Sequence, residues 1–179
     1  NIPESVIKIG LSAFSDCTGL TSIVLPNSLT TIEGYMFFHC DNITSVTLPE
    51  NVTIIKDYAF AYCPITSLLL PSTLTSIGEC AFTAAQTPSI SIPASVTDIG
   101  RMAFYSGVQQ LFFNSESAPS IGEKPFYESQ NLQIYVPCNA LGNYQNDEDW
   151  AQYKDYLKTA SHKFFISSSN KNYGTVSIN

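Results

Sequence analysis

Apolar and polar residues alternate over a short segment that recurs along most of the chain. The segment occupies residues 23–26, 46–49, 68–71, 90–93, 111–114 and 134–137. Every copy ends in proline except the fifth, in which Asn114 takes the place of the proline. Alternation predicts a half-buried β-strand, and proline ends the strand because it has no N–H to donate to a neighbour. We therefore expect one short strand in each copy.

The rest of each copy keeps a constant phase with its proline. The first five prolines of the series, starting at Pro3, are spaced 23, 23, 22 and 22 residues apart. Val or Leu follows each proline after three residues and Ile follows after six, which predicts a second buried edge. An aromatic residue then occupies one fixed position in six successive copies: Phe14, Phe37, Phe60, Phe82, Phe104 and Phe126. We expect a tight helical or 3-10 turn around this Phe.

A fixed period of this length is typical of a solenoid, in which each repeat forms one coil. One coil cannot bury its apolar edge alone, so the coils stack and their strands lie parallel. The sequence therefore predicts an α/β repeat solenoid of about six coils, made mostly of short parallel β-strands with short helical or 3-10 turns.

The repeat pattern stops after Pro137, and the chain then changes character. Four residues, 146–149, three of them acidic, lead into Trp150, Tyr153 and Leu157, whose spacings of three and four predict an amphipathic helix. Lys154, Lys158 and Lys163 follow towards its end, as the helix dipole favours. We expect this helix to cap the last coil. A calcium site at Asp147 and Asp149 is the alternative explanation of the acidic residues.

Three segments are predicted from these boundaries. Residues 1–138 contain the repeats, residues 139–165 the C-terminal cap, and residues 166–179 a linker or the start of a following module. Because the chain opens in the middle of a repeat, we expect further coils to precede it.

The pattern I-x-L-P…V-x-x-I-x-x-x-A-F-x-x-C in residues 1–138 resembles the leucine-rich repeats of the BspA-like bacterial surface antigens. The resemblance implies a right-handed leucine-rich-repeat superhelix on an extracellular or cell-surface bacterial protein. It also implies adhesion to host matrix proteins and to other cells, with no shared catalytic residues. The fifth copy departs from the pattern at Asn114, and its gap to Ile121 is one residue longer.

Charge and hydropathy exclude two kinds of partner, nucleic acids and the interior of a membrane. Eight Lys and Arg residues against fifteen Asp and Glu give a net charge of −7, and Arg101 is the one arginine. Nucleic-acid binding requires a basic face that neutralises phosphates, so we expect no nucleic-acid partner. No stretch reaches the roughly 20 apolar residues of a membrane-spanning helix, so we expect no membrane insertion.

The cysteines suggest packing rather than chemistry. Cys17, Cys40 and Cys63 each lie three residues after the repeated Phe, and later copies place Ala85, Gly107 and Ser129 there. A metal or redox column is one interpretation. A tight inner corner that accepts only small side chains is the interpretation we favour, because free Cys behaves as a small buried hydrophobe.

Catalytic residues are sparse. A hydrolytic site needs a nucleophile, a base and an orienting group, and the histidines are His39 and His162 alone. His39 shares its repeat position with Asp16, Tyr62 and Ala84, so nothing at that position requires a base. We therefore predict no enzymatic activity, no cofactor and no metal ion.

The remaining candidate is the outward side of the predicted strands, because alternate residues of a strand point to opposite faces. One outward column contains Gln110 and Gln133, and the next contains Thr47, Leu69, Phe112 and Tyr135. Aromatic residues concentrate binding energy at interfaces, so these six residues are the predicted binding site. A second candidate surface consists of Tyr35, Tyr58, Tyr105 and Tyr127 in the turns.

Two functions fit this pattern. The first is a monomeric, non-enzymatic binding domain that recognises a host or neighbouring-cell protein or glycan through its strand face. The alternative is a structural spacer that holds other modules away from the cell surface. Exposed aromatic residues on neighbouring coils favour binding, whereas an all-polar strand face would have favoured a spacer.

Overall fold

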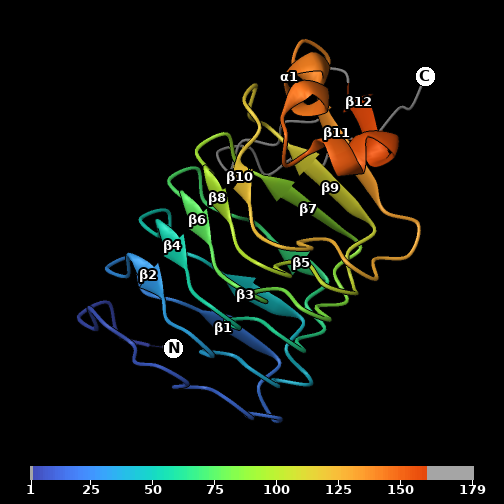
Figure 1. The fold of residues 1–179 in the computed structure, drawn as a ribbon. Helices are drawn as coiled ribbons and strands as arrows, with labels where there is room; N and C mark the ends of the chain where they lie inside the picture. The colour runs from blue at the N-terminus through green and yellow to red at the C-terminus, as the bar shows by residue number, and fades with distance from the viewer. Residues whose placement is uncertain (1, 161–179) are drawn as a thin grey trace.

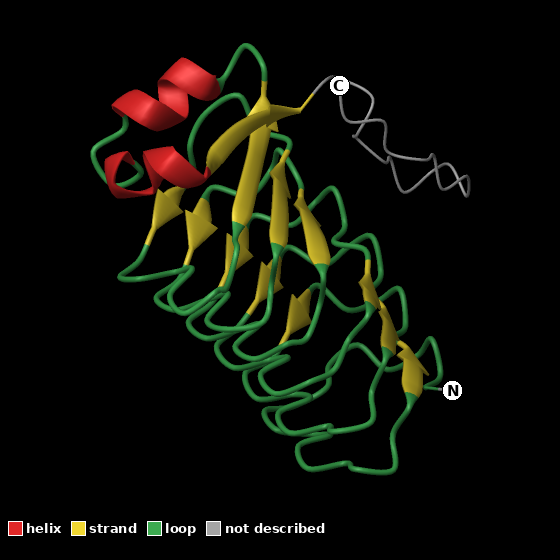
Figure 2. Cartoon of the chain, turned by 90° about the vertical axis from the view of Figure 1, so that its right-hand side faces the viewer, coloured by secondary structure: helices red, strands yellow, loops and turns green. Residues whose placement is uncertain are grey.

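The computed structural model describes residues 2–160, which wind into a stack of coils with parallel strands (Figure 1). Successive coils lie side by side along one axis, from the blue N-terminal coil to the orange C-terminal cap. Short strands lie on two sides of the coils, joined by turns and loops (Figure 2). This architecture is the repeat solenoid that the sequence period predicts.

The strands on the first side coincide with the alternating segments. They are β1 (Ser22–Val24), β3 (Ser45–Thr47), β5 (Ser67–Leu68), β7 (Ser89–Ile92), β9 (Gln110–Phe113) and β11 (Gln133–Pro137). β1, β3 and β5 form one parallel sheet, and β7, β9 and β11 form another with β12 (Leu157–Ala160). The prediction of one parallel strand per alternating segment is therefore confirmed, although the strand face is divided into two sheets.

A second ladder of very short strands follows the prolines. It consists of β2 (Thr31–Ile32), β4 (Ile54–Ile55), β6 (Ser76–Ile77), β8 (Asp98–Ile99) and β10 (Ser120–Ile121), all parallel in one five-stranded sheet. The isoleucine that ends each of the first four strands is buried. The sequence predicts this region only as a buried edge, because two residues are too few to show alternation.

A column of stacked phenylalanines lies at the centre of the core. The rings of Phe14, Phe37, Phe60, Phe82, Phe104 and Phe126 follow one another with centroids 5.4 to 6.1 Å apart. Alanines precede several of them in the chain, and those at positions 59, 81 and 103 are themselves fully buried. Each coil thus contributes one ring to the column, and the ring of each inner coil links it to both neighbouring coils.

The turn around each of these rings is held by two alternating sets of hydrogen bonds. In the second coil, the backbone N–H groups of Tyr35, Phe37 and His39 donate to carbonyls of the next coil. The intervening N–H groups of Met36 and Phe38 donate to carbonyls three residues earlier in the same coil. The predicted tight turn is present, but its residues form successive turns and not a regular helix.

Two residues in each of these turns adopt the left-handed backbone conformation. Tyr35 and His39 both have φ of 54°, and the same two positions have positive φ in every coil. Residues other than glycine enter this region at a cost of roughly 1 kcal/mol or more. The hydrogen bonds to the next coil stabilise the conformation, since both left-handed residues donate one.

The C-terminal cap differs from the predicted helix. The α-helix is α1 (Leu141–Asn146), which precedes the acidic residues, and the segment after them is a 3-10 helix, η1 (Ala151–Tyr156). Leu157 lies outside both helices and starts β12, which pairs with β11. Trp150, Tyr153 and Leu157 all pack in or against the core. Their spacing does not mark a single helix, because Trp150 precedes η1 and Leu157 begins β12.

Trp150 anchors this cap on the last coil. Its side chain is fully buried, its indole Nε1 donates to the carbonyl of Pro119 at 2.8 Å, and its ring meets Phe113 and Tyr144 edge to face. No helix within residues 2–160 is long and apolar enough to cross a lipid bilayer. Lys163, His162 and the predicted linker at residues 166–179 lie outside the described residues.

Candidate functional site

The predicted outward columns lie on the solvent side of the strands. Register pairs Gln110 with Gln133, and Phe112 with Tyr135. In the first sheet, Thr47 of β3 and Leu69, directly after β5, are exposed, Leu69 by 56%. The inward neighbours on β9 and β11 are buried, so the alternation that the sequence predicts is confirmed.

Four of the six predicted residues come together on β9 and β11. The rings of Phe112 and Tyr135 stack with centroids 4.8 Å apart and planes 9° apart. The Tyr135 hydroxyl donates to Oε1 of Gln133 at 2.7 Å, and Nε2 of Gln110 donates to the same oxygen at 3.4 Å. These contacts fix both the rings and the amides. We call Gln110, Phe112, Gln133 and Tyr135 the strand-face patch.

Thr47 and Leu69 are not part of this patch. They belong to the first sheet, whereas β7, β9 and β11 belong to the second, and the strand β7 lies between Leu69 and the patch in the order of coils. The six predicted residues therefore share one face of the solenoid but form two groups on it.

The turns hold a second aromatic group that the sequence identified only in part. Tyr35 and Tyr58 stack with centroids 4.8 Å apart, as their shared repeat position predicts. His39 stacks on Tyr62 at 4.5 Å, with the two planes 2° apart, and Phe38 lies edge-on between the two stacks. We call Tyr35, Phe38, His39, Tyr58 and Tyr62 the turn patch. His39 and Tyr62 occupy one column, which is the signal that could have revealed their contact.

Tyr105 and Tyr127, the other two predicted turn residues, form a separate and looser pair. Their rings are 6.0 Å apart and tilted by 32°. The Tyr105 hydroxyl donates to Glu128, and this hydrogen bond raises the pKa of Tyr105. Nζ of Lys124 lies 5.2 Å from the centre of the Tyr127 ring.

Among the described residues, His39 has one carboxylate and one buried thiol close to it in the chain. Its Nδ1 lies 3.5 Å from the carboxylate of Asp41, which would suit an orienting group. The nearest thiol in the chain, Cys40, donates from Sγ to the carbonyl of Phe14 and is buried. Burial raises the pKa of the Cys40 thiol to about 11, so the thiolate needed for nucleophilic attack is scarce at neutral pH.

The cysteine column is a packing feature in the structure. Cys63 is fully buried and donates from Sγ to the carbonyl of Phe37 at 2.9 Å, as Cys40 does one coil earlier. Ser129 occupies the same column and makes the equivalent bond to Phe104 at 3.1 Å. All five cysteines are free thiols, so Cys80 and Cys138 are not paired with each other.

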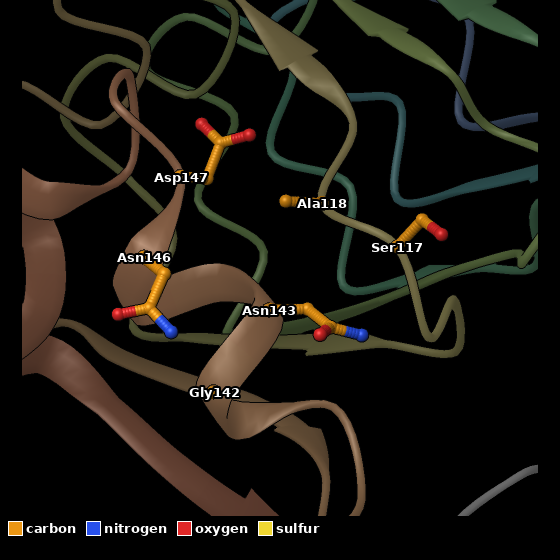
Figure 3. A pocket seen from close by; sticks show the side chains of 6 residues that line it. All are labelled: Ser117, Ala118, Gly142, Asn143, Asn146 and Asp147. Carbon is orange, nitrogen blue, oxygen red and sulfur yellow. The ribbon is translucent and has the colours of Figure 1, made fainter.

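A shallow hollow of about 410 Å³ lies between the loop at Ser117 and Ala118 and the helix α1 (Figure 3). Asn143, Asn146 and Asp147 line its other side. Oδ1 of Asp147 accepts hydrogen bonds from the backbone N–H groups of Asp149 and Trp150. This carboxylate therefore satisfies two backbone N–H groups ahead of η1. Within residues 2–160, no group of three or more His, Cys, Asp or Glu residues could hold a metal ion.

Comparison with known proteins bears on the fold and the family. The family model described as "BspA type Leucine rich repeat region" matches residues 1–64 and 53–147 in six copies. No curated protein matches the chain. A leucine-rich-repeat protein of T. pallidum superimposes with a TM-score of 0.63 at 23% identity, over 72% of this chain and 61% of the other.

Two further solved structures have the same fold. A leucine-rich-repeat protein of Bacteroides ovatus gives a TM-score of 0.58 at 25% identity, over 72% of this chain and 42% of that one. A leucine-rich cell surface protein of Faecalibacterium prausnitzii gives 0.50 at 24% identity, over 74% of this chain and 45% of that one. The chain thus spans less than two thirds of the length of each of these proteins.

Proposed function

Because this chain belongs to the BspA-type leucine-rich-repeat family, we propose that it is a binding domain of a bacterial surface protein. It contacts a host or neighbouring-cell protein or glycan through its strand face and carries out no chemical reaction. An extracellular or cell-surface location is part of the proposal, supported by the similarity to the cell surface protein of Faecalibacterium prausnitzii. We also propose that the domain acts as a monomer.

The stack of Phe112 on Tyr135 is the observation that carries this proposal. A partner that binds these rings does not have to immobilise them, because their stacking and the Tyr135–Gln133 hydrogen bond already restrict them. The two glutamines beside the rings offer amide donors and acceptors that suit peptide groups and sugar hydroxyls. Neither glutamine carries a charge, so the patch itself does not discriminate by charge.

A structural spacer remains the competing function. Regular stacking of coils gives a stiff body, which is what a spacer requires. A spacer does not need two aromatic rings placed side by side on its solvent face, and this feature favours binding.

The test is a binding screen of the purified domain against immobilised matrix proteins and a glycan panel, by surface plasmon resonance. The double variant Phe112→Ala, Tyr135→Ala removes the stacked pair. Tyr156→Ala is the matched control, since Tyr156 is an aromatic residue of the cap and is 44% exposed. We expect saturable binding that weakens about tenfold or more in the double variant and is unchanged in the control.

Equal binding by all three proteins would place the contact away from the strand-face patch. No binding by any of them would favour the spacer. Circular dichroism of each variant shows whether a loss of binding reflects a loss of folding.

A further inference from the structure

The residues of the turn patch belong to the loops that follow β2 and β4 (Figure 1). The ring of Phe38 meets those of Tyr35, His39, Tyr58 and Tyr62 edge-on, at centroid distances of 4.5 to 6.3 Å. Despite this packing, Tyr35 is 37% and Tyr62 is 42% exposed. A ligand would thus meet rings whose orientation is already fixed, which lowers the entropy cost of binding.

Each of the two ring stacks ends beside a small side chain. The residue at the position of Tyr35 in the preceding coil is Ser12, and the residue at the position of Tyr62 in the following coil is Ala84. Within residues 2–160, no further aromatic ring continues either stack at these ends. The face of Tyr35 towards Ser12 and the face of Tyr62 towards Ala84 therefore have no ring of the same column stacked on them, and both side chains are exposed.

The charges around the patch are unbalanced. Lys56 is paired with Glu33 at 2.6 Å, and Arg101 is paired with Glu79, so the nearby cations are occupied. Asp41 is 58% exposed at its side chain and contacts His39, and no Lys or Arg of the described chain pairs with it.

Asp16 adds a second carboxylate on the same side. It occupies the position of His39 one coil earlier, and its backbone N–H donates to the carbonyl of Phe38 at 2.8 Å. Its side chain accepts a hydrogen bond from the hydroxyl of Ser15 and pairs with no Lys or Arg of the described chain. Asp16 and Asp41 thus lie beside His39 and Phe38 of the turn patch without a Lys or Arg partner in the described chain, in a protein whose net charge is −7.

We propose that the turn patch docks a cationic segment of a protein partner, with Lys or Arg side chains over the unstacked faces of Tyr35 and Tyr62 and beside Asp16 and Asp41. Aromatic faces attract cations, and a planar guanidinium also stacks on them. A neutral glycan would gain nothing from the surplus of carboxylates, and an acidic partner would be repelled by it. This surface is separate from the strand-face patch, so either proposal can fail without the other.

The test measures fluorescence anisotropy of a labelled peptide of alternating glycine and arginine. The variant Tyr35→Asn, Tyr62→Asn removes both rings and keeps a residue type that tolerates positive φ. We expect its affinity to fall about tenfold, as two cation–π contacts are lost. The variant Tyr156→Ala, at an exposed aromatic residue of the cap outside both patches, is the control for loss of a ring, and its affinity should match that of the unmodified protein.

A second pair of variants separates a local site from general attraction to an acidic protein. Asp16→Asn, Asp41→Asn removes two charges beside the patch, and Glu148→Gln, Asp155→Asn removes two charges on the cap. The proposal expects weaker binding from the first pair alone. Equal weakening by both pairs, or unchanged binding by the ring variant, overturns it. Equal binding of the same peptide with citrulline in place of arginine, or of a neutral oligosaccharide instead, overturns it as well.

Discussion

The phenyl rings of Phe60 and Phe82 lie almost parallel, with centroids 5.4 Å apart and planes 9° apart. Both side chains are fully buried. Phe60 also stacks on Phe37 on its other side, whereas Phe14 at the start of the column stacks on Phe37 alone and is only partly buried. The same residue type at the same repeat position thus differs in the number of neighbouring rings.

Phe60→Ala should therefore destabilise the protein more than Phe14→Ala. Loss of a fully buried Phe costs about 3–5 kcal/mol, from lost burial and from the cavity that remains. At Phe14 we expect about 1–2 kcal/mol, because less apolar surface is buried there. Urea unfolding followed by circular dichroism measures both values. Equal losses would show that the column does not stabilise inner coils more than the first one.

The strands and the Phe column could be predicted from the sequence because their residues recur in constant phase. The left-handed turn residues could not. Tyr58, Tyr62 and Met102 all have positive φ, yet none is of the residue types, such as Gly or Asn, that signal this conformation. The hydrogen bonds that their N–H groups donate to carbonyls of the next coil hold them there, and a pattern within one repeat does not show contacts between repeats.

Gly100→Ala should destabilise the protein by about 1–3 kcal/mol, the usual cost of overpacking. A Cβ at this position would lie 2.5 Å from the backbone nitrogen of Glu79 and 2.6 Å from the carbonyl carbon of Gly78. Close approach of two coils is what requires glycine at this position. Thermal unfolding of the variant measures the effect.

Gly10→Ala is the matched control, since Gly10 has the same repeat position and no atom within 4 Å of its Cβ site. We expect no loss of stability, and a gain of up to about 1 kcal/mol from the reduced entropy of the unfolded chain. A loss at Gly10 as large as that at Gly100 would contradict the steric explanation.

The protein should lose stability as the pH rises above about 9, in part through two buried thiols. Burial raises the pKa of Cys40 from 9.0 to about 11 and that of Cys63 from 9.0 to about 12. Folding therefore favours the protonated thiols, and this contribution is complete below the unfolded pKa. It declines from pH 9 and is lost as the pH passes the folded values. Each thiol changes the slope of the unfolding free energy against pH by up to about 1.4 kcal/mol per pH unit.

The variant Cys40→Ala, Cys63→Ala isolates this effect, because tyrosines with raised pKa also contribute at alkaline pH. Its free energy of unfolding should fall less steeply between pH 9 and 11 than that of the unmodified protein. Parallel curves would show that the two thiols titrate alike in the folded and unfolded chains.

The strand-face patch could be predicted from the sequence, whereas the turn patch could be predicted only in part. Gln110, Phe112, Gln133 and Tyr135 follow from strand alternation, which fixes both their face and their register. Phe38 escaped notice although Tyr105 and Tyr127 hold the same repeat position in later coils, because Ala61 and Thr83 separate it from them. The sequence did not reveal α1 either, because Gly142, Asn143 and Asn146 show no helical pattern of apolar residues. The buried side chain of Tyr144 holds this helix in place.

The hydrogen bonds that the turns donate from each coil to the next also determine how the molecule should respond to force. They join neighbouring coils at three points in each turn, so pulling on the chain ends should detach one terminal coil while leaving those behind it intact. Each detached coil would release 22 or 23 residues, a gain in length of roughly 75 Å. A solenoid built this way would extend under force in small regular steps and would recoil by restacking its coils.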